Sequence, residues 1–117
     1  QLTLVVALLI DDEQYSEALD MVEAVLAGTL SNRLRGDFLR LAGTALTGKG
    51  DDAEAIRKFE ESMRLSPLTY EGGLGYVYSL IQVGRLDDAK MRLERLEQRF
   101  GRKPRLELLE QVLEGER

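Results

Sequence analysis

Ala42 to Pro67 reads AGTALTGKGDDAEAIRKFEESMRLSP, in which the short connection GKGDD separates two segments rich in helix-forming residues. In the second segment apolar residues recur at the spacing of one helix face, at Ala55, Ile56, Phe59 and Met63. Asp51 or Asp52 is placed to cap this helix, and Pro67 follows its end. The pattern predicts a helix over residues 51–65 that lies antiparallel to a helix before it.

The same design occurs twice more, over Ser16 to Ala27 and over Asp87 to Phe100. A more apolar stretch precedes each copy, at residues 2–10, 38–46 and 74–83. A shift of the chain against itself by 34 residues aligns Leu46 with Leu80, Gly50 with Gly84, Ala55 with Ala89 and Phe59 with Leu93. We therefore expect an all-α chain with six helices in three antiparallel pairs.

Two segments leave alternatives open. Residues 104–115 predict a seventh helix, with Leu106, Leu109 and Leu113 on one face. It is either a capping helix or the first half of a truncated fourth unit, because its other face carries Leu108 and Val112. Three glycines interrupt the stretch before residue 83, at Gly72, Gly73 and Gly75. We favour close packing between the second and third units over a helix that starts late or bends.

The central segment resembles the tetratricopeptide repeat (TPR) family, a 34-residue helix-turn-helix unit. The matching positions are Gly43, Leu46, Gly50, Asp51, Ala55, Phe59 and Pro67. The outer units diverge, since Val6 and Val77 replace the helix glycine and Gly101 stands at the place of the proline. The resemblance implies one domain, residues 1–117, that forms an α-solenoid of three TPR-like units (about 1–30, 33–67 and 69–101) plus a C-terminal capping helix. It also implies a protein-protein interaction scaffold.

In this family the first helices of the units line a concave groove that binds a peptide or a partner helix. The resemblance implies that the exposed positions of those helices here are Thr3, Ala7 and Ile10 in the first unit, Asp37, Arg40, Thr44 and Thr47 in the second, and Glu71, Leu74, Tyr78 and Ile81 in the third. Arg40 is the only cation among them, so a clamp for a C-terminal carboxylate is not supported. Leu74 and Ile81 have an alternative role in packing against neighbouring helices. Tyr78 is the better candidate because its ring can be buried while its hydroxyl stays hydrated.

The N-terminal stretch suggests a second function. Residues 2–10 are apolar on every side apart from Thr3, whereas a helix in a two-layer stack needs only one or two buried faces. Either an upstream repeat or a second copy of the chain would cover the excess. Homodimerisation through Leu4 and Leu8 is the alternative to peptide binding.

The composition argues against several classes of function. The net charge of -5 argues against binding of nucleic acid or anionic lipid. The chain has no Cys and no His, so we expect no enzyme, no cofactor and no metal site. GTALTGKG from Gly43 matches the spacing of a phosphate-binding loop but ends in Gly50 where a hydroxyl is needed. The acidic pairs Asp11–Asp12, Asp51–Asp52 and Asp87–Asp88 stand at predicted helix starts, where the helix dipole stabilises negative charge.

The sequence predicts no membrane insertion, because the longest apolar run is far shorter than the roughly 20 residues that a bilayer span needs. We expect a cytoplasmic protein, or a periplasmic one if a signal or anchor was removed upstream of Gln1. The start at Gln1 suggests a fragment or a processed form.

Overall fold

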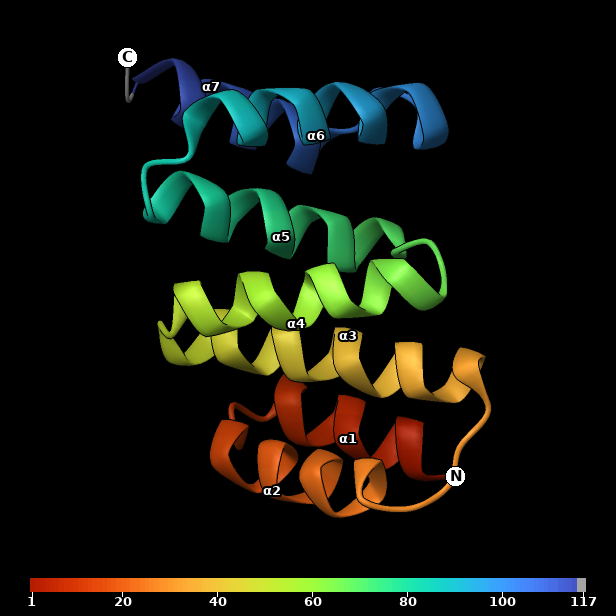
Figure 1. Ribbon diagram of the computed structural model, residues 1–117. Coiled ribbons are helices and arrows are strands. Elements are labelled where there is room, and N and C mark those ends of the chain that lie inside the picture. The colour runs from red at the N-terminus through yellow and green to blue at the C-terminus, as the bar shows by residue number, and fades with distance from the viewer. Residues whose placement is uncertain (116–117) are drawn as a thin grey trace.

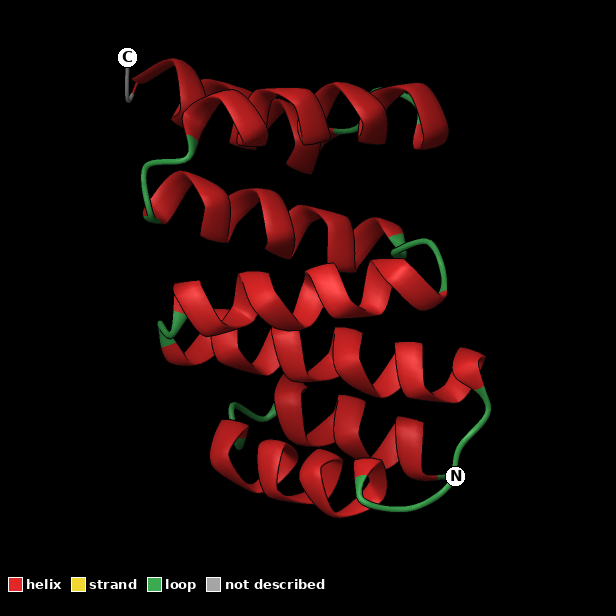
Figure 2. Ribbon diagram, in the orientation of Figure 1, coloured by secondary structure: helices red, strands yellow, loops and turns green. Residues whose placement is uncertain are grey.

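A computed structural model describes residues 1–115, which contain seven helices and no strand (Figures 1 and 2). The all-α prediction is therefore confirmed. The helices are α1 (Leu2–Asp11), α2 (Tyr15–Leu26), α3 (Asn32–Lys49), α4 (Asp52–Leu65), α5 (Tyr70–Gln82), α6 (Leu86–Phe100) and α7 (Pro104–Gly115).

The helices stack one on another from the N-terminal to the C-terminal end, and short loops alternate between the two sides of the stack (Figure 1). In one row, which we call the odd row, α1 packs on α3, α3 on α5 and α5 on α7. The helices α2, α4 and α6 lie against this row, each in contact with the odd helix before it and the odd helix after it. The result is an elongated body of 42 × 24 × 22 Å.

The helix α3 joins two hydrophobic clusters. One side of α3, including Phe38 and Ala45, packs with Val6 of α1 and Val22 of α2. Leu46 instead belongs to a larger cluster built by α4, α5, α6 and α7. Because one long helix contributes to both clusters, the N-terminal helices and the C-terminal helices are held in a single packed unit.

The turns within the three helical hairpins share one geometry. Each contains a residue in the left-handed region: Glu13 (φ 61°), Gly50 (φ 90°) and Gly84 (φ 82°). In each turn the next backbone N–H donates to a carbonyl five residues earlier: Gln14 to Leu9 (2.8 Å), Asp51 to Leu46 (2.9 Å) and Arg85 to Leu80 (2.9 Å). Backbone bonds of this kind satisfy the last carbonyls of a helix. Gly50 and Gly84, which the 34-residue shift aligns in the sequence, therefore occupy the same place in two equivalent turns.

Two helix starts differ from the sequence prediction. Asp51 occupies the N-cap position of α4, but its side chain accepts no capping hydrogen bond, so the predicted capping role of Asp51 is wrong. The helix α3 begins at Asn32, well before the apolar stretch at 38–46. Ser31 caps this earlier start by accepting a hydrogen bond from the Leu34 N–H at 3.2 Å.

The glycines of α5 serve close packing and the helix does not start late, but the predicted contact between the second and third units holds only for Gly72 and Gly75, because Gly73 packs against α6 of its own hairpin. Thr69 caps α5 by accepting a hydrogen bond from the Gly72 N–H at 3.1 Å, ahead of all three glycines. A Cβ atom on Gly73 would collide with the side chain of Leu96 in α6, and one on Gly75 would lie 3.2 Å from the Phe59 ring. Close approach between helices is therefore the reason for these glycines.

Candidate functional site

A groove runs along the odd row between α5 and α7 and reaches α3. Its volume is about 380 Å³. The lining residues are Thr47 from α3, Glu71, Leu74, Gly75 and Tyr78 from α5, and Arg105, Leu108, Leu109 and Val112 from α7. Most of this surface is apolar, and its polar groups come from Thr47, Glu71, Arg105 and the Tyr78 hydroxyl.

Apolar side chains of two helices face each other across the groove. Leu108 and Val112 of α7 lie 34 residues after Leu74 and Tyr78 of α5. Since α5 and α7 are neighbours in the odd row, these four residues occupy equivalent positions on adjacent helices. At the corresponding places α3 carries Arg40 and Thr44, so the row changes from polar at α3 to apolar at α5 and α7.

The groove has a buried floor and an exposed apolar rim. Leu74 is 8% exposed and forms part of the floor, whereas Tyr78 is 41%, Leu108 60% and Val112 41% exposed. Large apolar side chains at such exposure lose contact with water when a partner covers them. The rim therefore offers binding energy that the folded chain itself does not use.

The hydroxyls of Thr47 and Ser79 and the carboxylate of Asp52 form a hydrogen-bonded chain next to the groove. The Ser79 hydroxyl donates to Asp52 Oδ1 at 2.8 Å, and its oxygen lies 2.9 Å from Thr47 Oγ1. Ser79 is fully buried, so both contacts satisfy a polar group that water cannot reach. These bonds tie α3, α4 and α5 together beneath the groove.

The position of α7, the far wall of the groove, is set by charge pairs. Arg105 of α7 pairs with Glu71 of α5 at the mouth of the groove. Arg102 binds three carboxylates, at 3.2 Å in Glu97, 3.3 Å in Glu107 and 2.8 Å in Glu110. The hydrogen bond from Arg102 lowers the pKa of the Glu110 carboxyl. All these groups are exposed, so the pairs orient α7 more than they stabilise the fold.

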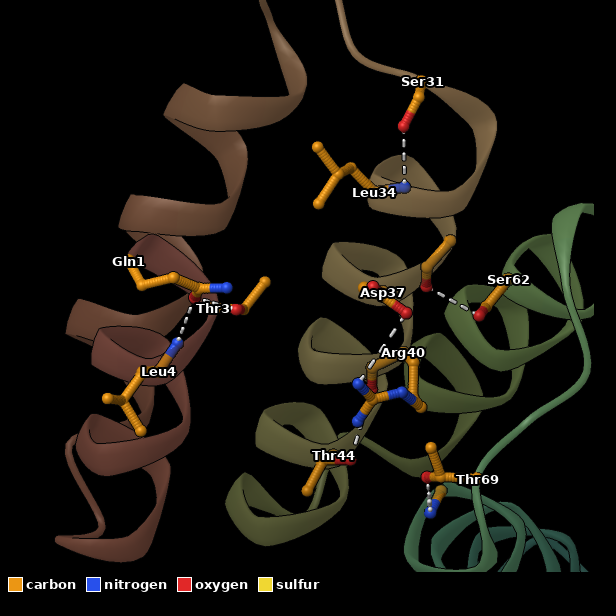
Figure 3. Close-up of polar contacts among 12 residues, drawn as sticks. Gln1, Thr3, Leu4, Ser31, Leu34, Asp37, Arg40, Thr44, Ser62 and Thr69 are labelled. Atoms are coloured by element: carbon orange, nitrogen blue, oxygen red, sulfur yellow. Dashed lines mark hydrogen bonds and ion pairs between the residues drawn. The ribbon is translucent and has the colours of Figure 1, made fainter.

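The charged positions predicted on α3 are engaged with one another (Figure 3). Arg40 lies 4.0 Å from Asp37, and the Thr44 hydroxyl donates to the Arg40 carbonyl at 3.2 Å. The stem of Arg40 packs beside Gly72 of α5. Glu71 pairs with α7 rather than with Arg40, so the structure does not join these residues into one charged patch.

The remaining predicted groove positions differ in accessibility. Ile81 is 4% and Leu74 8% exposed, and both pack in the larger hydrophobic cluster, so the expected exposure of these two residues is wrong, although Leu74 still lines the groove from below. Thr3, Ala7 and Ile10 are half-buried on α1 and lie outside the groove. Of the predicted set, Thr47, Glu71, Leu74 and Tyr78 line the groove together.

The N-terminal helix presents a second apolar surface. Leu4 is 59% and Leu8 55% exposed, and Leu2 and Val5 beside them are 51% and 39% exposed. On this helix Val6 alone is fully buried. The residues named from the sequence as a self-association surface are therefore accessible.

Sequence reasoning missed the contribution of α7 to the groove. The apolar pair Leu108 and Val112 was recognised as a second face of the tail helix, but the sequence left the neighbour of that face undetermined. The 34-residue spacing from Leu74 and Tyr78 is the signal that could have placed it. In the structure α7 packs on α5 and α6 as α5 packs on α3 and α4, so α7 continues the odd row.

Within residues 1–115, no helix has the length and hydropathy needed to cross a bilayer, and no cluster of acidic side chains is arranged to hold a metal ion. Comparisons with protein-family models, with curated proteins and with solved structures returned no match to this chain.

Proposed function

We propose that this chain is a protein-protein interaction scaffold of three TPR-like units, in which the odd row binds an apolar peptide or the apolar face of a partner helix. Two features support the repeat assignment. The residues from Gly43 to Pro67 resemble the TPR pattern, and the three hairpin turns share one hydrogen-bonding geometry. The row formed by α1, α3, α5 and α7 then corresponds to the ligand-binding helices of that family.

The observation that carries the proposal is the exposed apolar rim formed by Tyr78, Leu108 and Val112. These side chains border a groove of about 380 Å³ whose floor includes the buried Leu74. An amphipathic helix or an extended apolar peptide can cover the rim with side chains at alternate turns or alternate residues. Tyr78 is well suited to anchor such a contact, because tyrosine is enriched among residues that dominate binding energy.

Peptide display against the folded chain, followed by calorimetric titration of the selected peptides, tests this proposal. We expect Tyr78→Glu and Leu108→Glu each to weaken binding by about tenfold or more, because each places a charge against the apolar ligand face. Met91→Glu is the matched control, since Met91 is 40% exposed on α6 and lies outside the groove. The proposal fails if every selected peptide binds both rim variants as tightly as the unmodified chain.

Homodimerisation through α1 is the second candidate function. It is supported by the exposed side chains Leu4 and Leu8, which lie one helical turn apart beside Leu2 and Val5. Light scattering over a range of protein concentrations tests it, with Leu8→Glu as the disrupting variant. A mass that rises with concentration, and no longer does so in Leu8→Glu, supports the dimer. A monomeric mass at every concentration refutes it.

Neither candidate function includes catalysis. The sequence offers no thiol or imidazole for nucleophilic or acid-base chemistry.

A further inference from the structure

A second groove opens on the opposite face of α5. The helices α4 and α6 both pack on α5 rather than on each other in the described part of the chain, which leaves a depression of about 280 Å³ between them. Its apolar surface comes from Met63, Leu68, Tyr76 and Leu96. Three of these residues are buried, and Met63 is half-buried. The floor is therefore a preformed part of the core.

Three arginines of α6 line this second groove. Arg92, Arg95 and Arg99 lie at the i, i+3 and i+7 positions, which place them on one side of the helix. No carboxylate is among the groove's lining residues, and none of the three arginines forms an ion pair within residues 1–115. Arg85 and Arg102, by contrast, are each paired with acidic side chains. The Tyr76 hydroxyl donates to Glu60 at 2.9 Å, so one carboxylate stands behind the lining at Tyr76, while the lining itself carries three arginines in a chain of net charge -5.

Two of the three arginines also contact the protein. The Arg92 guanidinium lies 5.7 Å from the centroid of the Tyr76 ring, and Arg99 donates to the Leu68 carbonyl at 2.6 Å. These contacts hold both charges at the edge of the groove. Arg95 lies between them, is exposed, and has no hydrogen bond or ring contact within residues 1–115. Its guanidinium is free for a ligand.

We propose that the groove between α4 and α6 binds an acidic peptide segment that carries an apolar anchor residue. Charge complementarity selects this occupant: ligand carboxylates can form bidentate hydrogen bonds with guanidinium groups, while the anchor covers the apolar floor. The net charge of -5 opposes the extended phosphate backbone of a nucleic acid but acts less on a short segment held at a local positive rim. The site is independent of the rim at Tyr78, which lies on the other face of α5.

Fluorescence polarisation with the labelled peptide Asp-Glu-Leu-Phe-Glu-Asp tests this proposal on the full chain. We expect Arg95→Glu to weaken binding by about tenfold or more and Arg95→Lys to retain it within about threefold, because the interaction depends on charge at this position. Added salt should weaken binding as well. Arg33→Glu is the matched control, because Arg33 is exposed on α3, outside the groove, and forms no ion pair among the described residues.

Three further readouts separate the proposal from its alternatives. A peptide with Lys at each acidic position should not bind, and Tyr78→Glu should leave binding of the acidic peptide unchanged. The proposal is overturned if Arg95→Glu binds as the unmodified chain does, or if Tyr78→Glu abolishes binding. It is also overturned if a single-stranded oligonucleotide or vesicles of anionic lipid bind as tightly as the peptide and lose that binding in Arg95→Glu.

Discussion

Gly43 allows α3 and α4 to approach closely, and replacing it with alanine should destabilise the protein. A Cβ atom on Gly43 would lie 2.8 Å from two ring atoms of Phe59 and 2.9 Å from a third. The ring cannot move away easily, because Phe59 is fully buried and Gly75 of α5 also lies close to it. The ring of Tyr76, at a centroid distance of 5.9 Å, further confines it.

The expected loss follows from two opposing effects. Overpacking of a rigid core costs up to about 3 kcal/mol. Alanine in place of glycine within a helix contributes about 1 kcal/mol in the other direction. We therefore expect Gly43→Ala to lower the free energy of unfolding by about 2 kcal/mol. For a chain of this size, that loss corresponds to a decrease in Tm of about 8 °C.

Urea denaturation followed by far-UV circular dichroism measures this change. The double variant Gly43→Ala, Phe59→Leu provides the control, because the smaller side chain makes room for the new methyl group. The two substitutions should be less destabilising together than the sum of their separate effects, by about 1 kcal/mol or more. If Gly43→Ala instead stabilises the protein by about 1 kcal/mol, the helix-propensity effect dominates and the steric reasoning is refuted.

Two further predictions concern a turn and a buried hydroxyl. Glu13→Gly should raise the free energy of unfolding by about 1 kcal/mol, because Glu13 holds a φ of 61° that costs an L-residue about this much. Thermal or urea unfolding measures it, and unchanged or reduced stability contradicts the strain argument. Burial, followed by the hydrogen bond to Glu60, raises the pKa of Tyr76 to about 12. Since an unfolded tyrosine titrates near 10, the associated stability is present below pH 10 and should be lost as the pH rises from about 10 to 12. Unfolding of the unmodified chain and of Tyr76→Phe across this range tests the prediction, which fails if the two curves change in parallel.

Some residues of the groove between α5 and α7 could be predicted from the sequence, and others could not. Tyr78 and Glu71 could be named in advance, because the resemblance to a repeat family assigns them to one helix face. Ile81 could not be assigned correctly. Like Leu74, it is an apolar residue that the packing of the neighbouring helices buries, to 4% exposure for Ile81 and 8% for Leu74. Apolar periodicity identifies which residues leave water but not whether the covering partner is the same chain or another molecule.

The all-α class and the antiparallel order of the helices follow from local sequence patterns. Apolar residues at helical spacing, few prolines and short connections act over neighbouring positions, so they can be read along the chain. The left-handed turns at Gly50 and Gly84 belong to the same category, since glycine is the residue that adopts this backbone at little cost.

The location of the two candidate binding surfaces follows from the packing of helices that are distant in the sequence. The packing of α7 against α5 brings Leu108 and Val112 to Tyr78, although many residues separate them in the chain. The separation of α4 and α6 likewise leaves Arg92, Arg95 and Arg99 beside a largely apolar floor, without an ion pair among the described residues. Both surfaces depend on the distances between helices, and those distances are set by the volumes of side chains that meet only in the folded state.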